Sequence, residues 1–202
     1  DFSKFNFSDG NYPLGKWLIG NHIENNILDK TINLRLFGLF GEYEDFTRRF
    51  ISNNVCRILS GLPISINKDM KFDYLYIKDF CAYLKKILYK KTWSSRTYNF
   101  CSGKPIRLTE LAQIIKNLMG VEEMFTVNLQ GENREYSGDP SKLINEFGAL
   151  QTTPHERAIF EMIEFYKNQF AVKRNFKEDF IDSLLNARVV FSQQEKNRLK
   201  KH

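Results

Sequence analysis

Short apolar runs alternate along this chain with longer runs in which apolar residues recur every three or four positions. The short runs are typical of buried strands, and they cover residues 31–37, 74–77 and 97–101. The longer runs are typical of amphipathic helices, and they cover residues 13–28, 46–59, 80–88 and 108–119. Because strands and helices alternate, the pattern predicts an α/β fold.

Further helices are predicted from their starts or from their spacing. Asp139-Pro140 and Thr153-Pro154 each have the form of an N-cap residue followed by proline at the first helical position. Thr153 and Glu156 also have the spacing of a capping box, in which each side chain bonds the other's backbone N–H. A last helix is predicted over residues 176–188, and we find no internal repeat and no low-complexity linker.

Composition restricts the class of protein. With 202 residues, of which 42% are hydrophobic and 14% aromatic, the chain has the size and apolar content of a globular protein. No apolar run approaches the ~18–20 residues of a membrane span, and no apolar signal segment follows Asp1-Phe2-Ser3-Lys4. We therefore expect no membrane span and a cytoplasmic location. Because the sequence does not begin with Met, we also expect that Asp1 is not the natural first residue.

The cysteines and histidines fit neither a disulfide framework nor a metal site. The three cysteines are odd in number and widely spaced: Cys56, Cys81 and Cys101. The three histidines are too scattered for a triad or a metal site: His22, His155 and His202. We expect reduced, mostly buried thiols and no metal.

Positive charge is concentrated at the C-terminal end. From Lys173 onward, eight basic residues face four acidic ones, within a formal net charge of +6 for the whole chain. A basic tail can contact nucleic acid or an anionic membrane. Because no interleaved aromatic residues or nucleic-acid motif accompany it, we interpret it as a solvated helix or tail and expect no nucleic-acid partner.

Tyr12 and Lys16 are the strongest candidates for chemistry. Pro13 suits the first turn of a helix, and residues four apart then lie on one helical face. An ammonium near a phenol favours the phenolate and lowers the pKa of the phenol toward neutrality. The pair can therefore act as a general acid/base that takes a proton from a sugar hydroxyl while hydride leaves the adjacent carbon.

Five further segments follow this pair in order. They are Ile32–Gly41, Phe72–Asp79, Tyr98–Gly103, Leu108–Ala112 and Ser137–Leu143. Together they resemble the C-terminal half of an extended short-chain dehydrogenase/reductase, from the family of NAD-dependent nucleotide-sugar epimerases and dehydratases. The resemblance runs from about Tyr12 to Gln169.

This resemblance implies the C-terminal portion of a Rossmann-like fold, with its last sheet strands and helices, plus a small α/β substrate-binding subdomain. It assigns residues 1–60 to the end of the Rossmann-like core with the Tyr/Lys helix. Residues 61–170 are assigned mainly to the substrate-binding subdomain, interleaved with the core, and residues 171–202 to the basic helical tail. In the family motif, Asp73 and Asp79 organise the fold.

The resemblance also implies a site for NAD or NADP and a nucleotide-diphosphate sugar. Tyr12 is then the general acid/base, and Lys16 lowers its pKa and holds the nicotinamide ribose. The nicotinamide is bordered by Phe37, Gly38 and Leu39. The candidates for contacting the sugar nucleotide are Arg48, Arg49, Lys71, Asn99 and Arg134.

Several family features are missing. Gly38 stands where the family often has a substrate-contacting Asn, and Phe72 and a position near Leu129 stand where Arg commonly binds the diphosphate. The chain has no Gly-x-x-Gly-x-x-Gly turn for the pyrophosphate. The family's catalytic Ser/Thr normally lies some two dozen residues before the Tyr, and only eleven residues precede Tyr12. We therefore expect that this chain alone binds no NAD(P).

Three functional interpretations remain open. The first is part of an NAD(P)-dependent nucleotide-sugar epimerase, dehydratase or reductase. The second is a non-catalytic binding or assembly module derived from that family, and the third is an unrelated α/β domain. The resemblance also implies a homodimer formed through a helix bundle that includes the Tyr/Lys helix.

Overall fold

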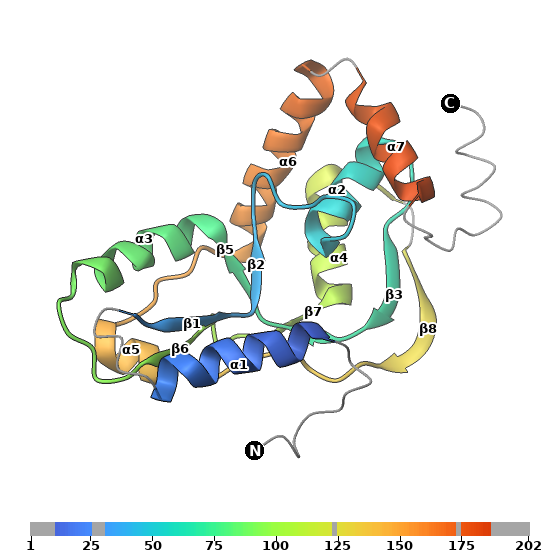
Figure 1. The fold of residues 1–202 in the computed structure, drawn as a ribbon. Helices are drawn as coiled ribbons and strands as arrows, with labels where there is room; N and C mark the ends of the chain where they lie inside the picture. Colours follow the sequence, from blue (N-terminus) through green and yellow to red (C-terminus); the bar gives the residue numbers. More distant parts are fainter. Residues whose placement is uncertain (1–10, 26–30, 123–124, 173–174, 187–202) are drawn as a thin grey trace.

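A computed structural model describes residues 11–25, 31–122, 125–172 and 175–186 (Figure 1). Along the chain the elements are α1 (Asn11–Asn25), β1 (Asn33–Leu36), β2 (Gly38–Phe40), α2 (Phe50–Leu59), β3 (Ser65–Asp69), β4 (Lys71–Phe72), β5 (Tyr74–Tyr76), α3 (Ile77–Tyr89), β6 (Thr97–Phe100), β7 (Ile106–Arg107), α4 (Leu108–Met119), β8 (Thr126–Glu132), α5 (Ser141–Phe147), α6 (His155–Val172) and α7 (Phe176–Asn186).

Three of the four strand pairs are parallel, and the fourth is antiparallel. The parallel pairs are β1 with β6, β2 with β5 and β3 with β8, and β4 pairs antiparallel with β7. A single residue, Phe37, separates β1 from β2, and Asp73 alone separates β4 from β5. Each of these two chain segments therefore passes from one strand pair directly into the next. The parallel pairs and their helices confirm the predicted α/β fold class.

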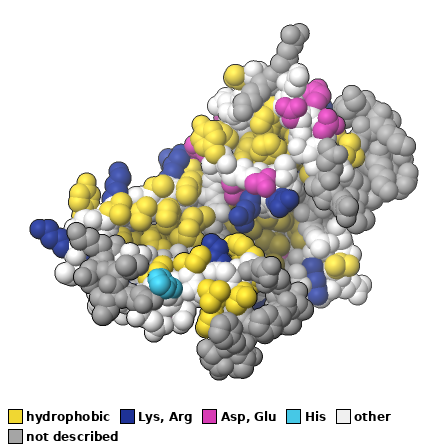
Figure 2. Space-filling model, viewed as in Figure 1, with side chains coloured by type: hydrophobic (Ala, Val, Ile, Leu, Met, Phe, Trp, Pro, Cys, Tyr) yellow, Lys and Arg dark blue, Asp and Glu magenta, His cyan; other side chains and the backbone are white. Residues whose placement is uncertain are grey.

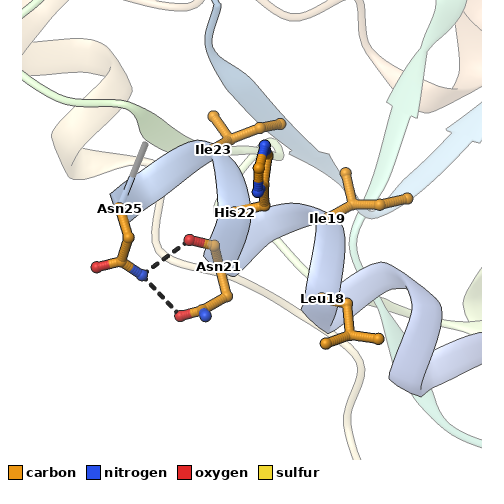
Figure 3. A pocket seen from close by; sticks show the side chains of 6 residues that line it. All are labelled: Leu18, Ile19, Asn21, His22, Ile23 and Asn25. Atoms are coloured by element: carbon orange, nitrogen blue, oxygen red, sulfur yellow. Dashed lines mark hydrogen bonds between the residues drawn. The ribbon is translucent and has the colours of Figure 1, made fainter. Parts of the chain in front are cut away.

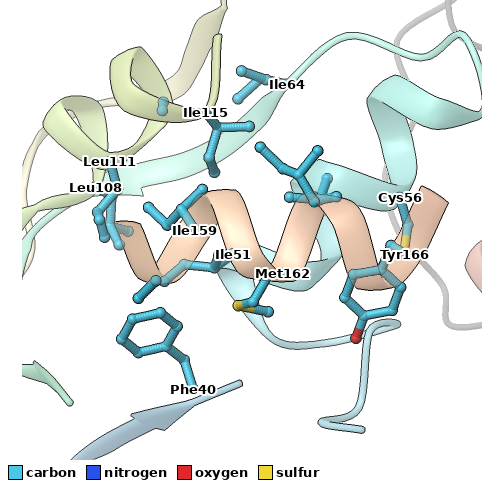
Figure 4. Packing of buried hydrophobic residues seen from close by; sticks show 14 of the residues in the cluster. Phe40, Ile51, Cys56, Ile64, Leu108, Leu111, Ile115, Ile159, Met162 and Tyr166 are labelled. Carbon is cyan, nitrogen blue, oxygen red and sulfur yellow. The ribbon is translucent and has the colours of Figure 1, made fainter. Parts of the chain in front are cut away.

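Three helices enclose the larger hydrophobic core. Helices α2, α4 and α6 contact one another, and their buried apolar residues meet beside β2 and β3 (Figure 4). In α6 the buried residues Ile159, Met162 and Tyr166 follow helical spacing, as the sequence predicts. We call α2, α4 and α6 the three-helix core.

A second, smaller core lies beneath α3 and α5. Its buried members are Leu75, Tyr83, Ile87, Tyr98, Phe100 and Leu143. Helix α1 lies beside β1 and β6 of this part of the molecule, away from the three-helix core (Figure 1). We call α1 and β1 the α1–β1 region.

Two buried or half-buried carboxylates fix loops, as predicted. Asp73 is fully buried, and its carboxylate accepts hydrogen bonds from the backbone N–H groups of Ser102 and Gly103, each at 2.8 Å. Asp79 accepts bonds from the backbone N–H and the hydroxyl of Thr153, both at 2.7 Å. Asp79 thereby ties α3 to the start of α6. The hydroxyl of Thr153 is used in this bond and does not form the expected capping box.

Some predicted boundaries are wrong for a local reason. The helix predicted from residue 46 begins at Phe50, because Asp45 bends the chain before it. The Asp45 carboxylate accepts a hydrogen bond from the Thr47 N–H at 3.1 Å, and the Asp45 carbonyl accepts one from the Arg49 N–H at 2.9 Å. The first of these is a side-chain bond to nearby backbone, and bonds of this kind compete with a regular helix.

Other boundaries differ by a few residues. Helix α3 begins at Ile77 rather than residue 80, and β1 is shorter than the predicted strand. The predicted ends of the first and last helices, at residues 26–28 and 187–188, lie outside the described residues. The division of the chain at residues 60 and 170 stays a prediction.

Candidate functional site

Helix α1 places Tyr12 and Lys16 on one face, as their spacing predicts. The Lys16 Nζ atom lies 5.5 Å from the centroid of the Tyr12 ring, within the range of a cation–π contact. Tyr12 is 75% exposed, so its hydroxyl is open to a ligand rather than packed in a core. The two side chains therefore form one accessible surface.

This surface forms part of a cleft of about 830 Å³ between α1, β1 and the start of β2. Five of the predicted site residues line it: Tyr12, Lys16, Phe37, Leu39 and Arg49. Figure 2 shows basic and hydrophobic side chains side by side in the middle of this face of the molecule. The fold therefore brings residues that are far apart in the sequence to one cleft.

The cleft runs along an open edge of β1. All four residues of β1, from Asn33 to Leu36, line the cleft. Because successive side chains of a strand point to opposite faces, a cavity that touches four in a row must follow the strand's edge. Among the described strands β1 pairs with β6 alone, so its other edge faces the cleft. An open edge can accept a further strand.

Gly38 has a packing role that its place in the sequence did not reveal. It is buried beside the cleft, and its N–H donates to the Asp73 carbonyl at 3.0 Å. A Cβ atom at this position would lie 2.5 Å from that carbonyl oxygen and 2.6 Å from the Phe72 ring. A glycine is therefore needed for β2 to approach the Phe72–Asp73 segment this closely.

Phe72, at the position where the resemblance leads us to expect an Arg, belongs to an aromatic column. The Phe72 ring lies 4.8 Å from Tyr136 and 4.7 Å from Tyr74, and Tyr136 lies 5.3 Å from Phe37. Tyr136 is fixed by backbone bonds to the β4 segment, since its N–H donates to the Lys71 carbonyl at 2.9 Å. Tyr136 also lines the cleft, although sequence reasoning had not selected it. The sequence feature that could have indicated Tyr136 is an aromatic residue two positions after the candidate Arg134.

The other four substrate candidates do not line the cleft. The Arg48 side chain is 82% exposed and pairs with Asp45 at 3.8 Å. Asn99 donates to the Asp139 carbonyl at 3.3 Å. Lys71 and Arg134 are exposed. The structure therefore supports Arg49 as a cleft residue and gives the other four no shared location with it.

A half-buried carboxyl, that of Glu44, interacts with the charge of Arg49. Burial raises the pKa of Glu44 to about 7, and bonds from Ser52 and the charge of Arg49 oppose that shift. Glu44 Oε1 accepts a bond from the Ser52 N–H at 3.3 Å in the first turn of α2, as expected for a carboxylate at a helix start. Glu44 Oε2 is buried and makes no hydrogen bond with the described residues.

His155 packs against the β2–β5 strand pair. Its Nε2 atom lies 3.3 Å from the Tyr74 carbonyl, and its ring stacks on Phe40 at 6.1 Å. Burial lowers its pKa. Within the described ranges no three His, Cys, Asp or Glu residues are grouped to hold a metal. The cysteines are free, and of them Cys81 is exposed, whereas Cys56 and Cys101 are buried.

The outer face of α1 carries a shallow apolar hollow of about 490 Å³ (Figure 3). Leu18 and Ile19 line it and are 46% and 60% exposed, and Ile23 extends it along the helix. At its end, the Asn25 amide donates to the Asn21 carbonyl at 2.8 Å. Dimerisation through this helix stays an expectation from resemblance.

The residues of the cleft fit one end of a nicotinamide dinucleotide. Tyr12, Lys16, Phe37 and Leu39 surround a space open enough for the nicotinamide and its ribose. The pyrophosphate end needs a glycine-rich turn at a helix N-terminus, and the 202 residues contain no such turn.

Residues 14–101 match the family model of the NAD dependent epimerase/dehydratase family. No curated protein matches the chain. A solved dTDP-glucose 4,6-dehydratase from Bacillus anthracis, in complex with NAD, is 21% identical with a TM-score of 0.59, over 69% of this chain and 45% of its own. A UDP-glucose 4-epimerase from Thermotoga maritima is 17% identical with a TM-score of 0.58, over 67% of this chain and 45% of its own.

An NAD-dependent NDP-hexosamine 5,6-dehydratase of tunicamycin biosynthesis is 16% identical with a TM-score of 0.64, over 76% of this chain and 51% of its own. This chain therefore spans about half the length of these solved structures, or less. Within the described residues no helix is both long and apolar enough to cross a membrane. The fold is the Rossmann-like α/β fold that these sugar-nucleotide epimerases and dehydratases share.

Proposed function

We propose that this chain supplies the Tyr/Lys side of the active site of an NAD(P)-dependent nucleotide-sugar epimerase, dehydratase or reductase. One observation carries the proposal. Tyr12 and Lys16 lie in contact on α1 and share a cleft with Phe37, Leu39 and Arg49. The match of residues 14–101 to the epimerase/dehydratase family model supports the same conclusion.

In this proposal the chain's own residues move the proton and hold the ligands. Tyr12 takes a proton from the sugar hydroxyl, or returns one to a carbonyl oxygen in the reverse direction. Lys16 stabilises the phenolate that forms and holds the ribose. Arg49 holds the diphosphate of the sugar nucleotide, because a guanidinium matches phosphate oxygens in a bidentate manner. NAD(P), when bound, supplies the acceptor for the hydride.

The open edge of β1 indicates how the site is completed. A parallel sheet is normally covered on both faces and paired along its strands, whereas β1 has one described partner and an edge that faces the cleft. We propose that a nucleotide-binding half with the glycine-rich turn pairs along this edge. The chain by itself is then inactive and has no measurable affinity for NAD(P)H. The free state of all three cysteines is compatible with the cytoplasmic location that we propose for the enzyme.

The test is turnover by the protein encoded by the whole open reading frame, with dTDP- and UDP-sugars as substrates and NAD(P)H absorbance as the readout. Tyr12→Phe removes the acid/base group, and we expect a loss of about 10²–10⁴-fold in turnover with NAD binding kept. Tyr43→Phe is the matched control, because Tyr43 is 83% exposed and does not line the cleft. Undiminished turnover by Tyr12→Phe would refute the assignment.

A second function is a non-catalytic binding or assembly module. The exposed Leu18 and Ile19 on α1 favour it, because neighbouring exposed apolar side chains suit contact with another protein. The same experiment separates the two functions. An assembly module shows neither turnover nor NAD(P)H binding in the whole protein, whatever stands at residue 12.

A further inference from the structure

The outer end of α3 exposes two neighbouring hydrophobic side chains. The inner face of this helix buries Tyr83 and Ile87 in the smaller core. Leu88 and Tyr89 in its last turn are 72% and 85% exposed, and Tyr89 has the largest exposed fraction of any large hydrophobic residue that the structure describes. None of the residues that the structure describes covers them, so they lie in water at an energetic cost.

Lysines surround these two side chains. From Phe80 through Arg96 the sequence has five basic residues, Arg96 included, and no acidic residue. Lys85 and Lys86 lie four and three positions before Tyr89, so both are its neighbours on the helix surface. Lys91 follows the end of the helix. We call the set Lys85, Lys86, Leu88, Tyr89 and Lys91 the α3 tip.

The charges of the tip lysines are not neutralised. Within the described residues, none of Lys85, Lys86 and Lys91 forms an ion pair. The Lys86 Nζ atom lies 5.1 Å from the centroid of the Tyr83 ring. Lys90 differs, because its ammonium pairs with Glu146, whose side chain is only 8% exposed. Three positive charges are therefore available to an external partner.

The shape of this end favours a flat partner. Helix α3 runs out to one extremity of the molecule (left in Figure 1), and Figure 2 shows basic and hydrophobic side chains together there. A projecting tip suits a planar surface, whereas a peptide or a small ligand needs a groove. We propose that the α3 tip docks on an anionic lipid bilayer, with Leu88 and Tyr89 in the headgroup boundary and the three lysines on anionic headgroups.

This proposal does not rest on the proposed function, because the tip and the cleft are made of different residues. Each of the two assignments can therefore fail without the other.

The test is co-sedimentation of the chain with vesicles. Vesicles of phosphatidylcholine alone are compared with vesicles that contain about one third phosphatidylglycerol. We expect binding to the anionic vesicles only, weakening as salt is added. The triple substitution Lys85→Gln, Lys86→Gln and Lys91→Gln should lower the partition coefficient about 100-fold, and Leu88→Ser with Tyr89→Ser should also lower it.

A matched control removes the same charge elsewhere. The triple substitution Lys68→Gln, Lys104→Gln and Lys167→Gln changes the net charge equally and leaves the α3 tip intact. It should bind nearly as well as the unmodified chain. Absence of binding to anionic vesicles would overturn the proposal. Equal losses in the two triple variants would also overturn it, because they would show that total charge, including the tail after Lys173, causes the binding. Circular dichroism confirms that each variant is folded.

Discussion

The three-helix core and the α1–β1 region cover their apolar surface to very different extents. Ile159 in the core is fully buried, whereas Ile19 on α1 is 60% exposed. In the core, α2, α4 and α6 contact one another, whereas the main contacts of α1 with other described elements are those with β1 and β6. The comparison teaches that the core is complete in itself, and that the α1–β1 region has the form of one side of an interface.

The largest expected effect on stability comes from replacing a core isoleucine, and we compare it with replacement of an isoleucine on α1. Ile159→Ala leaves a cavity in the three-helix core and should lower the free energy of unfolding by about 2–5 kcal/mol. Ile19→Ala removes an exposed side chain and should change it by less than about 0.5 kcal/mol. Denaturant titration of both variants measures the difference. A large cost for Ile19→Ala would mean that α1 is covered in solution.

A pair of glycines gives an intermediate effect. Gly38→Ala puts a methyl group 2.5 Å from the Asp73 carbonyl oxygen, and we expect a loss of about 1–3 kcal/mol of stability. Gly15→Ala is the control, because no atom lies within 4 Å of its added Cβ. In a helix interior that change should add about 0.5–1 kcal/mol. The midpoint temperature of thermal unfolding should therefore fall in Gly38→Ala and rise in Gly15→Ala.

The glycine pair also sharpens the comparison of the two regions. Gly15 lies between Tyr12 and Lys16, and its surroundings are open in the described structure. If Gly15→Ala is instead destabilising in the protein from the whole reading frame, another element approaches α1 at that point. Such a result would support the proposed nucleotide-binding half directly.

The sequence predicted the helices of the three-helix core better than the strands around them. Helices α2 and α4 have strongly periodic apolar positions, so their existence followed from spacing. Strand β3 has one buried apolar residue, Ile66, among polar neighbours, and it is defined by its pairing with β8 far along the chain. Such a pairing has no local signal.

The site was predictable where it depended on local spacing. Tyr12 and Lys16 meet because they lie four apart on one helix. Tyr136 joins the cleft through backbone bonds to Lys71 and stacking on Phe72, which only the folded chain brings together. The same stacking explains why Gly38 and Phe72 occur together, because Gly38 leaves the space that the Phe72 ring occupies.

The smallest effect concerns the loop that joins the two regions. Residues 41–49 lead from β2 beside the cleft to α2 in the core, and Glu44 in this loop is half-buried. Its pKa of about 7 in the folded chain lies above the ordinary value of 4.5. The folded state therefore binds the proton more tightly than the unfolded state, and stability should fall as the pH rises from about 5 to 8.

Glu44→Gln removes this titration because an amide stays neutral at every pH. Below pH ~4.5 the variant and the unmodified chain should have similar stability, and above pH ~7 the variant should be more stable by about 1–2 kcal/mol. Glu110→Gln is the control, since Glu110 is exposed and should leave the pH dependence unchanged. Denaturant titrations between pH 5 and 8, a window set by the raised pKa, measure the slope. If Glu44→Gln leaves the pH dependence of stability unchanged, the Glu44 carboxyl is accessible to water. The loop would then be exposed to solvent, as the α1–β1 region is.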